Sequence, residues 1–114
     1  MLKRVDKPWG HEEIWAETND YVGKVLFIKQ GHRLSLQHHI IKEETIRIAS
    51  GTMALELQSE SGEMETHTLN PGDSRHIAPG RRHRMYAVTD VQVYEVSTPH
   101  LSDVVRHQDD YGRT

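Results

Sequence analysis

The sequence predicts an all-β domain, and two features of the chain favour this class. Turn-forming residue pairs recur along the chain, and they separate short segments that are rich in β-branched and aliphatic residues. Such punctuation is typical of a β-sandwich or a β-barrel. With 114 residues and a hydrophobic fraction of 35%, the chain is long enough for one modest core. We therefore expect a single domain over residues 1–114.

Nine strands are predicted, in order, between these turns. They cover residues 12–15, 24–29, 34–39, 45–49, 53–58, 65–69, 74–77, 84–88 and 91–96. The separating pairs supply glycine, whose backbone freedom suits a turn, and they are Gln30-Gly31, Ser50-Gly51, Ser61-Gly62, Pro71-Gly72 and Pro79-Gly80. Residues 101–107 have the one pattern that suggests a helix, so we expect a short C-terminal helical tail.

Composition excludes several classes of protein. No stretch approaches the roughly 20 apolar residues of a membrane helix, and residues 1–6 lack the apolar region of a secretory signal. A cytoplasmic protein with no membrane partner is therefore expected. The net charge of -3 argues against general nucleic-acid binding, although residues 81–84 form a local basic run. The low apolar fraction suits a small β-domain that hides part of its surface in a homodimer.

Four polar side chains predict a metal site, namely Gln37, His39, Glu44 and His83. Because successive strand residues point to opposite faces, Gln37 and His39 share one face and His38 lies on the other. Glu44 has the same strand parity as Ile46 and Ile48, so its carboxylate is expected to point toward the interior. A buried carboxylate needs a partner, and a cation beside two imidazoles supplies one. The chain has no cysteine, so nitrogen and oxygen must provide the ligands.

The spacing of these residues resembles the two-motif signature of the cupin superfamily. Three further segments are similar to the cupin domain of phosphomannose isomerases: Arg33-Leu34-Ser35-Leu36-Gln37, Lys7-Pro8-Trp9-Gly10 and Asp110-Tyr111-Gly112-Arg113. The resemblance covers nearly the whole chain and implies a double-stranded β-helix, the jelly-roll barrel of cupins. In that family the domain often follows a sugar-nucleotide pyrophosphorylase domain. We expect the isomerase module to stand alone here, and a separate pyrophosphorylase partner stays an open question.

The resemblance also implies a function. Its members are metal-dependent isomerases that interconvert mannose 6-phosphate and fructose 6-phosphate through an enediolate. Zinc is favoured by the resemblance, whereas the ligand types alone also suit Mn, Fe, Co or Ni ions. The match of the closing motif implies a catalytic role for Arg106, whose alternative role is a surface ion pair. The proton-transferring base stays open among a metal-bound hydroxide, a free histidine and a residue of the tail.

A sugar phosphate also needs cationic and hydrogen-bonding side chains. Arg33 adjoins the strand of Gln37 and is expected at the barrel mouth, and Lys29 is a second candidate cation. The resemblance places the tail against the pocket, where Tyr111 could donate to the substrate. For each of the three, a surface charge or a packing role is the alternative. The other candidate cations are Lys24, Arg75, Arg82 and Arg84, of which Arg84 is expected to point outward.

Some residues depart from the family pattern and keep two other functions open. Ile40, Ile41 and Thr45 stand where relatives carry polar residues or a His-Trp pair, which alters the pocket wall. A non-catalytic cupin that binds a metal and a carbohydrate is therefore the first alternative. An iron-dependent oxygenase is the second, and Gln37 in place of a histidine ligand weakens it.

Overall fold

A computed structural model describes residues 2–114, and in that range it contains eleven β-strands and no helix. The strands are β1 (Lys3–Lys7), β2 (Gly10–Glu17), β3 (Val22–Ile28), β4 (Leu36–His38), β5 (Glu44–Ser50), β6 (Met53–Gln58), β7 (Met64–Leu69), β8 (Ser74–Ile77), β9 (His83–Ala87), β10 (Val91–Ser97) and β11 (Val105–Gln108). All nine predicted strands are present, with shifts at their ends. The predicted all-β class is confirmed.

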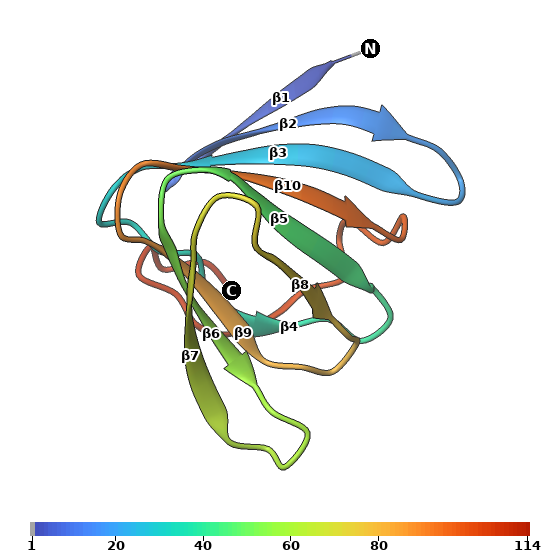
Figure 1. Ribbon diagram of the computed structural model, residues 1–114. Coiled ribbons are helices and arrows are strands. Elements are labelled where there is room, and N and C mark those ends of the chain that lie inside the picture. Colours follow the sequence, from blue (N-terminus) through green and yellow to red (C-terminus); the bar gives the residue numbers. More distant parts are fainter. Residues whose placement is uncertain (1) are drawn as a thin grey trace.

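The strands form two antiparallel sheets that face each other (Figure 1). One sheet has six strands in the order β1-β2-β3-β10-β5-β8, and the other has five in the order β11-β4-β9-β6-β7. Buried residues alternate with more exposed ones along β5 and β10, as a half-buried strand requires. The core between the sheets consists of Trp9, Leu26, Ile28, Ile46, Ile48, Met53, Leu55, Leu69, Ile77, Met85, Ala87, Val91 and Val93.

Both ends of the described chain differ from the prediction. Strand β1 was not predicted, and it lies at the edge of the six-stranded sheet against β2. The predicted helical tail is wrong, because residues 105–108 form strand β11 beside β4. In that ladder Val105 lies opposite His38, and Arg106 lies opposite Gln37. Pairing with a strand distant in sequence thus overrides the local helical pattern. No helix in residues 2–114 has the length and apolarity needed to span a membrane.

Two glycines fit positions that a larger residue cannot occupy. At Gly51, in the predicted turn between β5 and β6, φ is 81°, and a Cβ atom would lie 2.0 Å from the carbonyl oxygen of Asp90. At Gly10, where β2 begins, a Cβ atom would lie 1.9 Å from the carbonyl oxygen of Phe27. The close pairing of β2 with β3 therefore depends on this glycine, which belongs to the opening Lys-Pro-Trp-Gly motif.

Candidate metal centre

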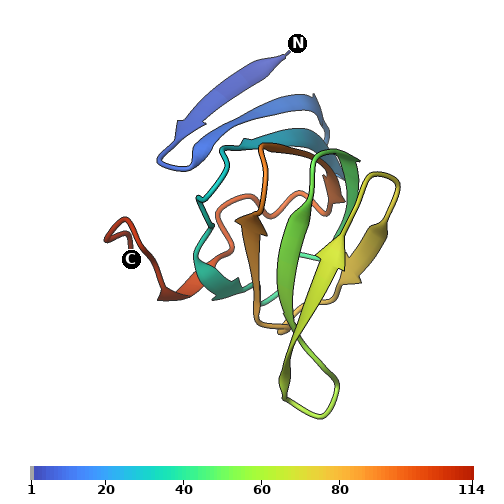
Figure 2. The same ribbon diagram turned by 60° about the vertical axis from the view of Figure 1, so that its left-hand side comes forward.

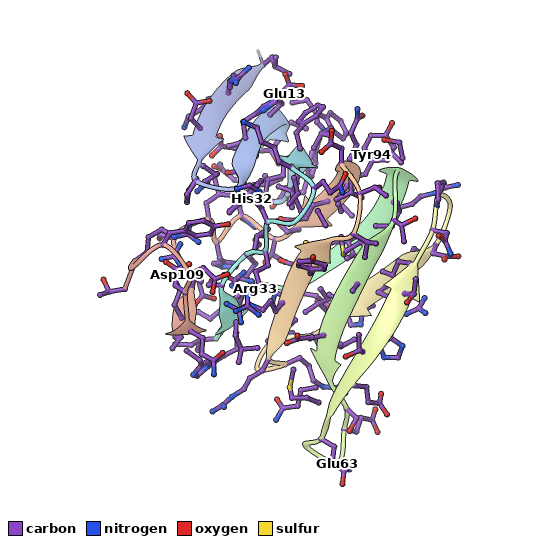
Figure 3. The ribbon with its side chains drawn as sticks, turned by 90° about the vertical axis from the view of Figure 1, so that its left-hand side faces the viewer. Glu13, His32, Arg33, Glu63, Tyr94 and Asp109 are labelled. Carbon is purple, nitrogen blue, oxygen red and sulfur yellow. The ribbon has the colours of Figure 1, made fainter. Side chains whose placement is uncertain are left out.

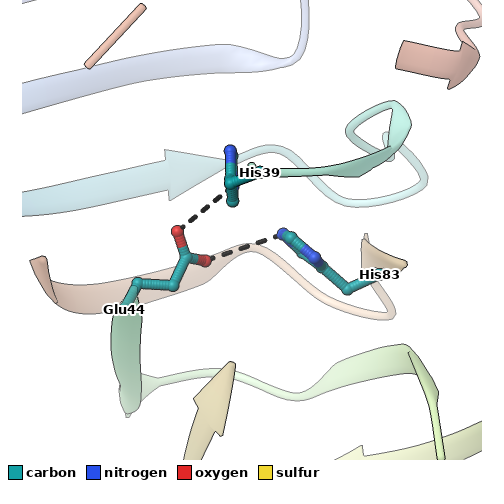
Figure 4. A group of neighbouring side chains, drawn as sticks. All are labelled: His39, Glu44 and His83. Carbon is teal, nitrogen blue, oxygen red and sulfur yellow. Dashed lines mark ion pairs between the residues drawn. The ribbon is translucent and has the colours of Figure 1, made fainter. Parts of the chain in front are cut away.

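Three predicted ligands meet inside the barrel. His39 directly follows β4, Glu44 begins β5 and His83 begins β9. Their exposed fractions are 4%, 3% and 1%, and their ligand atoms all lie within 4.8 Å of one another. Figure 4 shows the Glu44 carboxylate between the two imidazoles. The alternation of strand residues therefore directs all three side chains to one point, as the sequence predicts.

Both imidazoles are held in the tautomer that suits a metal. His39 Nδ1 donates to the carbonyl oxygen of Asp103 at 2.5 Å, and His83 Nδ1 donates to that of Arg81 at 3.0 Å. Because a carbonyl oxygen only accepts, each Nδ1 carries a proton, and in the neutral form of the imidazole each Nε2 then has a free lone pair. Both Nε2 atoms are buried and have no hydrogen-bond partner among residues 2–114. Such orphaned acceptors fit a bound cation.

The carboxylate of Glu44 completes this group. Its Oε2 lies 3.4 Å from His39 Nε2, and its Oε1 lies 3.7 Å from His83 Nε2. Burial by itself would raise the pKa of Glu44, but the positive charge of Lys42 beside the carboxylate opposes burial, and the pKa is lowered. Burial also lowers the pKa of His83, which keeps its imidazole neutral. Two imidazole nitrogens and one carboxylate are a donor set for a borderline divalent ion.

Gln37 lies in the same cavity wall as His39. Its Oε1 accepts a hydrogen bond from Ser35 Oγ at 2.7 Å, so the amide is already oriented by the residue two positions before it. Its ligation of the ion stays a prediction. His38 points away from the three ligands and lies beside β11, with its Nδ1 2.7 Å from Nε2 of His107. The sequence predicts that His38 and His39 lie on opposite faces and cannot both be equivalent ligands, and this position of His38 agrees with that prediction.

A buried charge network adjoins the three ligands and was not predicted. Lys42 Nζ lies 3.1 Å from Glu44 Oε2 and 3.1 Å from Glu95 Oε2. Lys24 Nζ lies 3.6 Å from Glu95 Oε2 and 3.2 Å from Glu12 Oε2. All five side chains are buried. The Glu44 carboxylate therefore already has one cationic neighbour, which leaves Oε1 directed at His83.

Strand parity contained a signal for this network. Lys24 shares its face of β3 with Leu26, and Glu95 shares its face of β10 with Val93. A charged residue in register with buried aliphatic ones predicts a buried charge, which needs an opposite charge beside it. Lys24, one of the candidate cations for the substrate, is therefore buried and paired with Glu12 and Glu95.

His39, Glu44 and the charge network line one cavity of about 280 Å³, whereas His83 is not among its lining residues. Trp9, Leu26 and Met85 give it an apolar wall that continues into the core. Arg106 reaches the same cavity from β11. Its Nη1 donates to the carbonyl oxygen of Thr114 at 2.9 Å, while its Nε is buried without a partner in the described part of the chain. The predicted catalytic arginine thus lines the same cavity as the candidate metal ligands His39 and Glu44.

The three residues predicted to bind substrate are not brought to this cavity. Arg33 pairs with Asp110, with Nε to Oδ2 at 2.6 Å, and Figure 3 shows Arg33 beside the C-terminal segment. Lys29 is exposed and does not line the cavity. Tyr111 packs against the core from outside, with the guanidinium of Arg113 5.4 Å from its ring centre. Arg33 and Tyr111 are held outside the cavity by their contacts, and Lys29 extends into solvent. The geometry therefore does not support a substrate-binding role for any of the three.

The C-terminal segment also covers Arg84. This side chain lies on the face opposite His83, as expected, yet it is buried rather than solvated. Its Nε donates to the carbonyl oxygen of Leu34 at 2.8 Å, and its Nη2 lies 3.4 Å from Asp110 Oδ1. Arg84 therefore anchors the tail to the barrel and is not available to a ligand in the cavity.

Several solved structures share this fold. KdgF from Halomonas sp. is 22% identical with a TM-score of 0.75, and the match covers 86% of each chain. An RmlC-like cupin from Shewanella frigidimarina is 14% identical with a TM-score of 0.74, over 87% of this chain and 85% of that one. Oxalate decarboxylase from Bacillus subtilis is 12% identical with a TM-score of 0.78, over 92% of this chain and 30% of that one.

The predicted double-stranded β-helix is confirmed by these structures. No curated protein matches the sequence. A family model does match, over residues 1–109, and it describes the C-terminal domain of mannose-6-phosphate isomerase. The chain therefore belongs to the mannose-6-phosphate isomerase C-terminal family and is a cupin domain of the phosphomannose isomerase type.

Proposed function

We propose that the protein is a metal-dependent sugar-phosphate isomerase that interconverts mannose 6-phosphate and fructose 6-phosphate. The observation that best supports this is the pair of buried, unpartnered Nε2 atoms of His39 and His83 on either side of Glu44. Membership of the mannose-6-phosphate isomerase C-terminal family supports the choice of reaction. Zinc is the ion we favour, and the homodimer stays a prediction.

The proposed reaction needs no oxidant or second substrate. A proton leaves C2 of the open-chain aldose and is returned at C1, while the hydroxyl proton moves from O2 to O1. His39, Glu44 and His83, with Gln37 as a further candidate, would hold the divalent ion. When bound, the ion supplies positive charge where negative charge develops on the substrate oxygens.

The chain itself supplies the rest of the chemistry. Arg106 presents a guanidinium to the same cavity, where it would stabilise the enediolate and would not take up the proton. The apolar wall around Trp9 keeps water away from the carbanion-like carbon. Glu12 and Glu95 are two carboxylates of the cavity wall besides Glu44, and they are candidates for the group that carries the proton between C1 and C2.

The test is turnover of mannose 6-phosphate by the protein loaded with zinc, manganese or cobalt. We expect Arg106→Ala to lower kcat by about 100-fold or more, as loss of an oxyanion-stabilising donor does, with unchanged metal content. Arg47→Ala is the matched control, because Arg47 is exposed on the outer face of β5. Full metal content without any turnover in the unmodified protein would reject the isomerase and favour the non-catalytic cupin. Full turnover in Arg106→Ala would remove this residue from the mechanism.

A further inference from the structure

The two strands that were not predicted bring positive charge to one side of the cavity. Along β1, Lys3 and Lys7 have the same parity, and both line the cavity. From the other end of the chain, Arg106 on β11 and Arg113 beyond it also line it. Figure 2 shows the turn between β1 and β2 on the same side of the molecule as the C-terminal segment. Four cationic side chains thus border the cavity at this side.

These cations differ from those beside the metal ligands because several of their donors are free. Lys42 and Lys24 are each paired with buried glutamates. Lys3 and Lys7, in contrast, form no ion pair with any residue between 2 and 114. The Nε of Arg106 is buried and has no partner in the same range. Unpaired cationic donors facing a cavity are available to an anion.

Asp109 holds Arg113 in place and leaves one edge of the Arg113 guanidinium open. Its Nε lies 3.1 Å from Asp109 Oδ2 and its Nη2 lies 2.8 Å from Asp109 Oδ1. A guanidinium carries five N–H donors, so the Nη1 edge stays available after this bidentate contact. The side chain of Asp109 is itself almost fully buried, and its carboxylate accepts from the backbone N–H and from the guanidinium of Arg113, which fixes the tail there.

The positive charges at this side of the cavity repel one another, as the pKa of Lys7 indicates. Burial lowers the pKa of Lys7, Glu12 opposes that effect, and the positive charges of Lys24, Arg113 and Arg106 lower the pKa further. Lys7, Arg113 and Arg106 therefore lie within electrostatic reach of one another. An anion among them would remove this repulsion. Arg106 also lies opposite Gln37 in the strand ladder, which connects the cationic side to the metal centre.

We propose that Lys7 and Arg113, with Lys3 at the rim, form an anion subsite that binds the phosphate group of the substrate. The identity of the sugar rests on the proposed function, but binding of the anion does not. A phosphate monoester dianion has the charge and the acceptor oxygens to take one ammonium and one guanidinium edge at once. The subsite replaces Arg33 and Lys29, which the structure leaves outside the cavity.

The test is binding of inorganic phosphate to the metal-loaded protein, measured by calorimetry. We expect Lys7→Gln and Arg113→Gln each to weaken binding about tenfold, the size of a lost charge-assisted contact. Arg47→Gln removes the same charge from the outer face and should bind phosphate as the unmodified protein does. In the isomerase assay, Lys7→Gln should raise KM for mannose 6-phosphate more than it lowers kcat.

Two results would overturn the subsite. One is equal phosphate affinity in Lys7→Gln, Arg113→Gln and the unmodified protein. The other is phosphate binding that persists in Lys7→Gln and disappears in Glu44→Gln, because that pattern would place the anion on the metal. Failure of the isomerase gives a different pattern, in which phosphate binding depends on Lys7 while no sugar phosphate is turned over.

Discussion

At the scale of single residues, Glu44 decides whether the two imidazoles can share an ion. Its carboxylate lies within 4.8 Å of both ligand nitrogens, and it supplies the negative charge of the donor set. Glu44→Gln keeps the shape of the side chain and removes that charge. Since loss even of a residue behind a ligand lowers metal affinity 10- to 100-fold, we expect a loss of about 100-fold or more here. Elemental analysis and metal titration of the purified variant measure it.

Glu43→Gln is the matched control for this change. Glu43 is the preceding residue, but it points outward and lies 2.5 Å from His76 on the surface. Its removal should leave the metal content unchanged. Stoichiometric metal in Glu44→Gln would contradict the assignment of the site, whatever the behaviour of Glu43→Gln.

The same scale explains which site residues could be predicted from sequence. Inward placement of Glu44 and His83 follows from strand alternation, which is a local property of the backbone. The direction of Arg33 is set by Asp110, which is 77 positions further along the chain. Likewise, Lys42 is buried because it meets Glu95, 53 positions away. Contacts of this kind depend on the closed barrel, so residue type and parity alone do not reveal them.

At the scale of elements, Asp103 holds the loop that carries His39 toward β5. Its carboxylate accepts hydrogen bonds from the backbone N–H groups of Ile40, Ile41 and Lys42, at 3.1, 2.7 and 2.9 Å. Its own carbonyl oxygen orients His39. These N–H groups, chiefly those of Lys42 and Ile41, lower the pKa of Asp103 to about 2. One residue of the tail therefore positions both the ligand and the loop behind it.

We expect Asp103→Asn to weaken metal binding about tenfold, because an amide has one acceptor oxygen and cannot satisfy three N–H donors. Metal titration and thermal unfolding measure the effect on affinity and on stability separately. Asp73→Asn is the control, since Asp73 accepts from the backbone N–H of Asn70 in a turn of its own. That variant should lose stability without losing metal. Equal metal affinity in both variants would show that Asp103 has only a structural role.

The tail also marks the limit of prediction at this scale. Residues 101–107 have a pattern that suggests a helix, but Val105 and Arg106 gain backbone partners on β4, and Asp103 is held by the loop after His39. Strand β1 could not be predicted for the same reason. Its residues are mostly exposed, and they form a strand because they pair with β2. The central strands were predicted because their aliphatic residues and glycine turns act locally.

At the scale of the molecule, the candidate metal site joins the two sheets. His39 follows β4 and His83 begins β9, both of the five-stranded sheet, whereas Glu44 begins β5 of the six-stranded sheet. A bound ion would therefore cross-link the two halves of the barrel, and ligand binding to the native state alone stabilises it.

Removal of the metal should consequently lower the stability of the whole domain. At a free ion concentration 100 times Kd, binding contributes about 2.7 kcal/mol, which corresponds to a Tm about 10 °C higher for a domain of this size. Chelation of the loaded protein should lower Tm by that amount, and added zinc should restore it. The Glu44→Gln variant separates this effect from any general action of the chelator. The Tm of this variant should be the same in the presence and in the absence of the chelator. An unchanged Tm on complete removal of the ion from the unmodified protein would mean that the two sheets hold together without it, through the core and the Lys42 ion pairs alone.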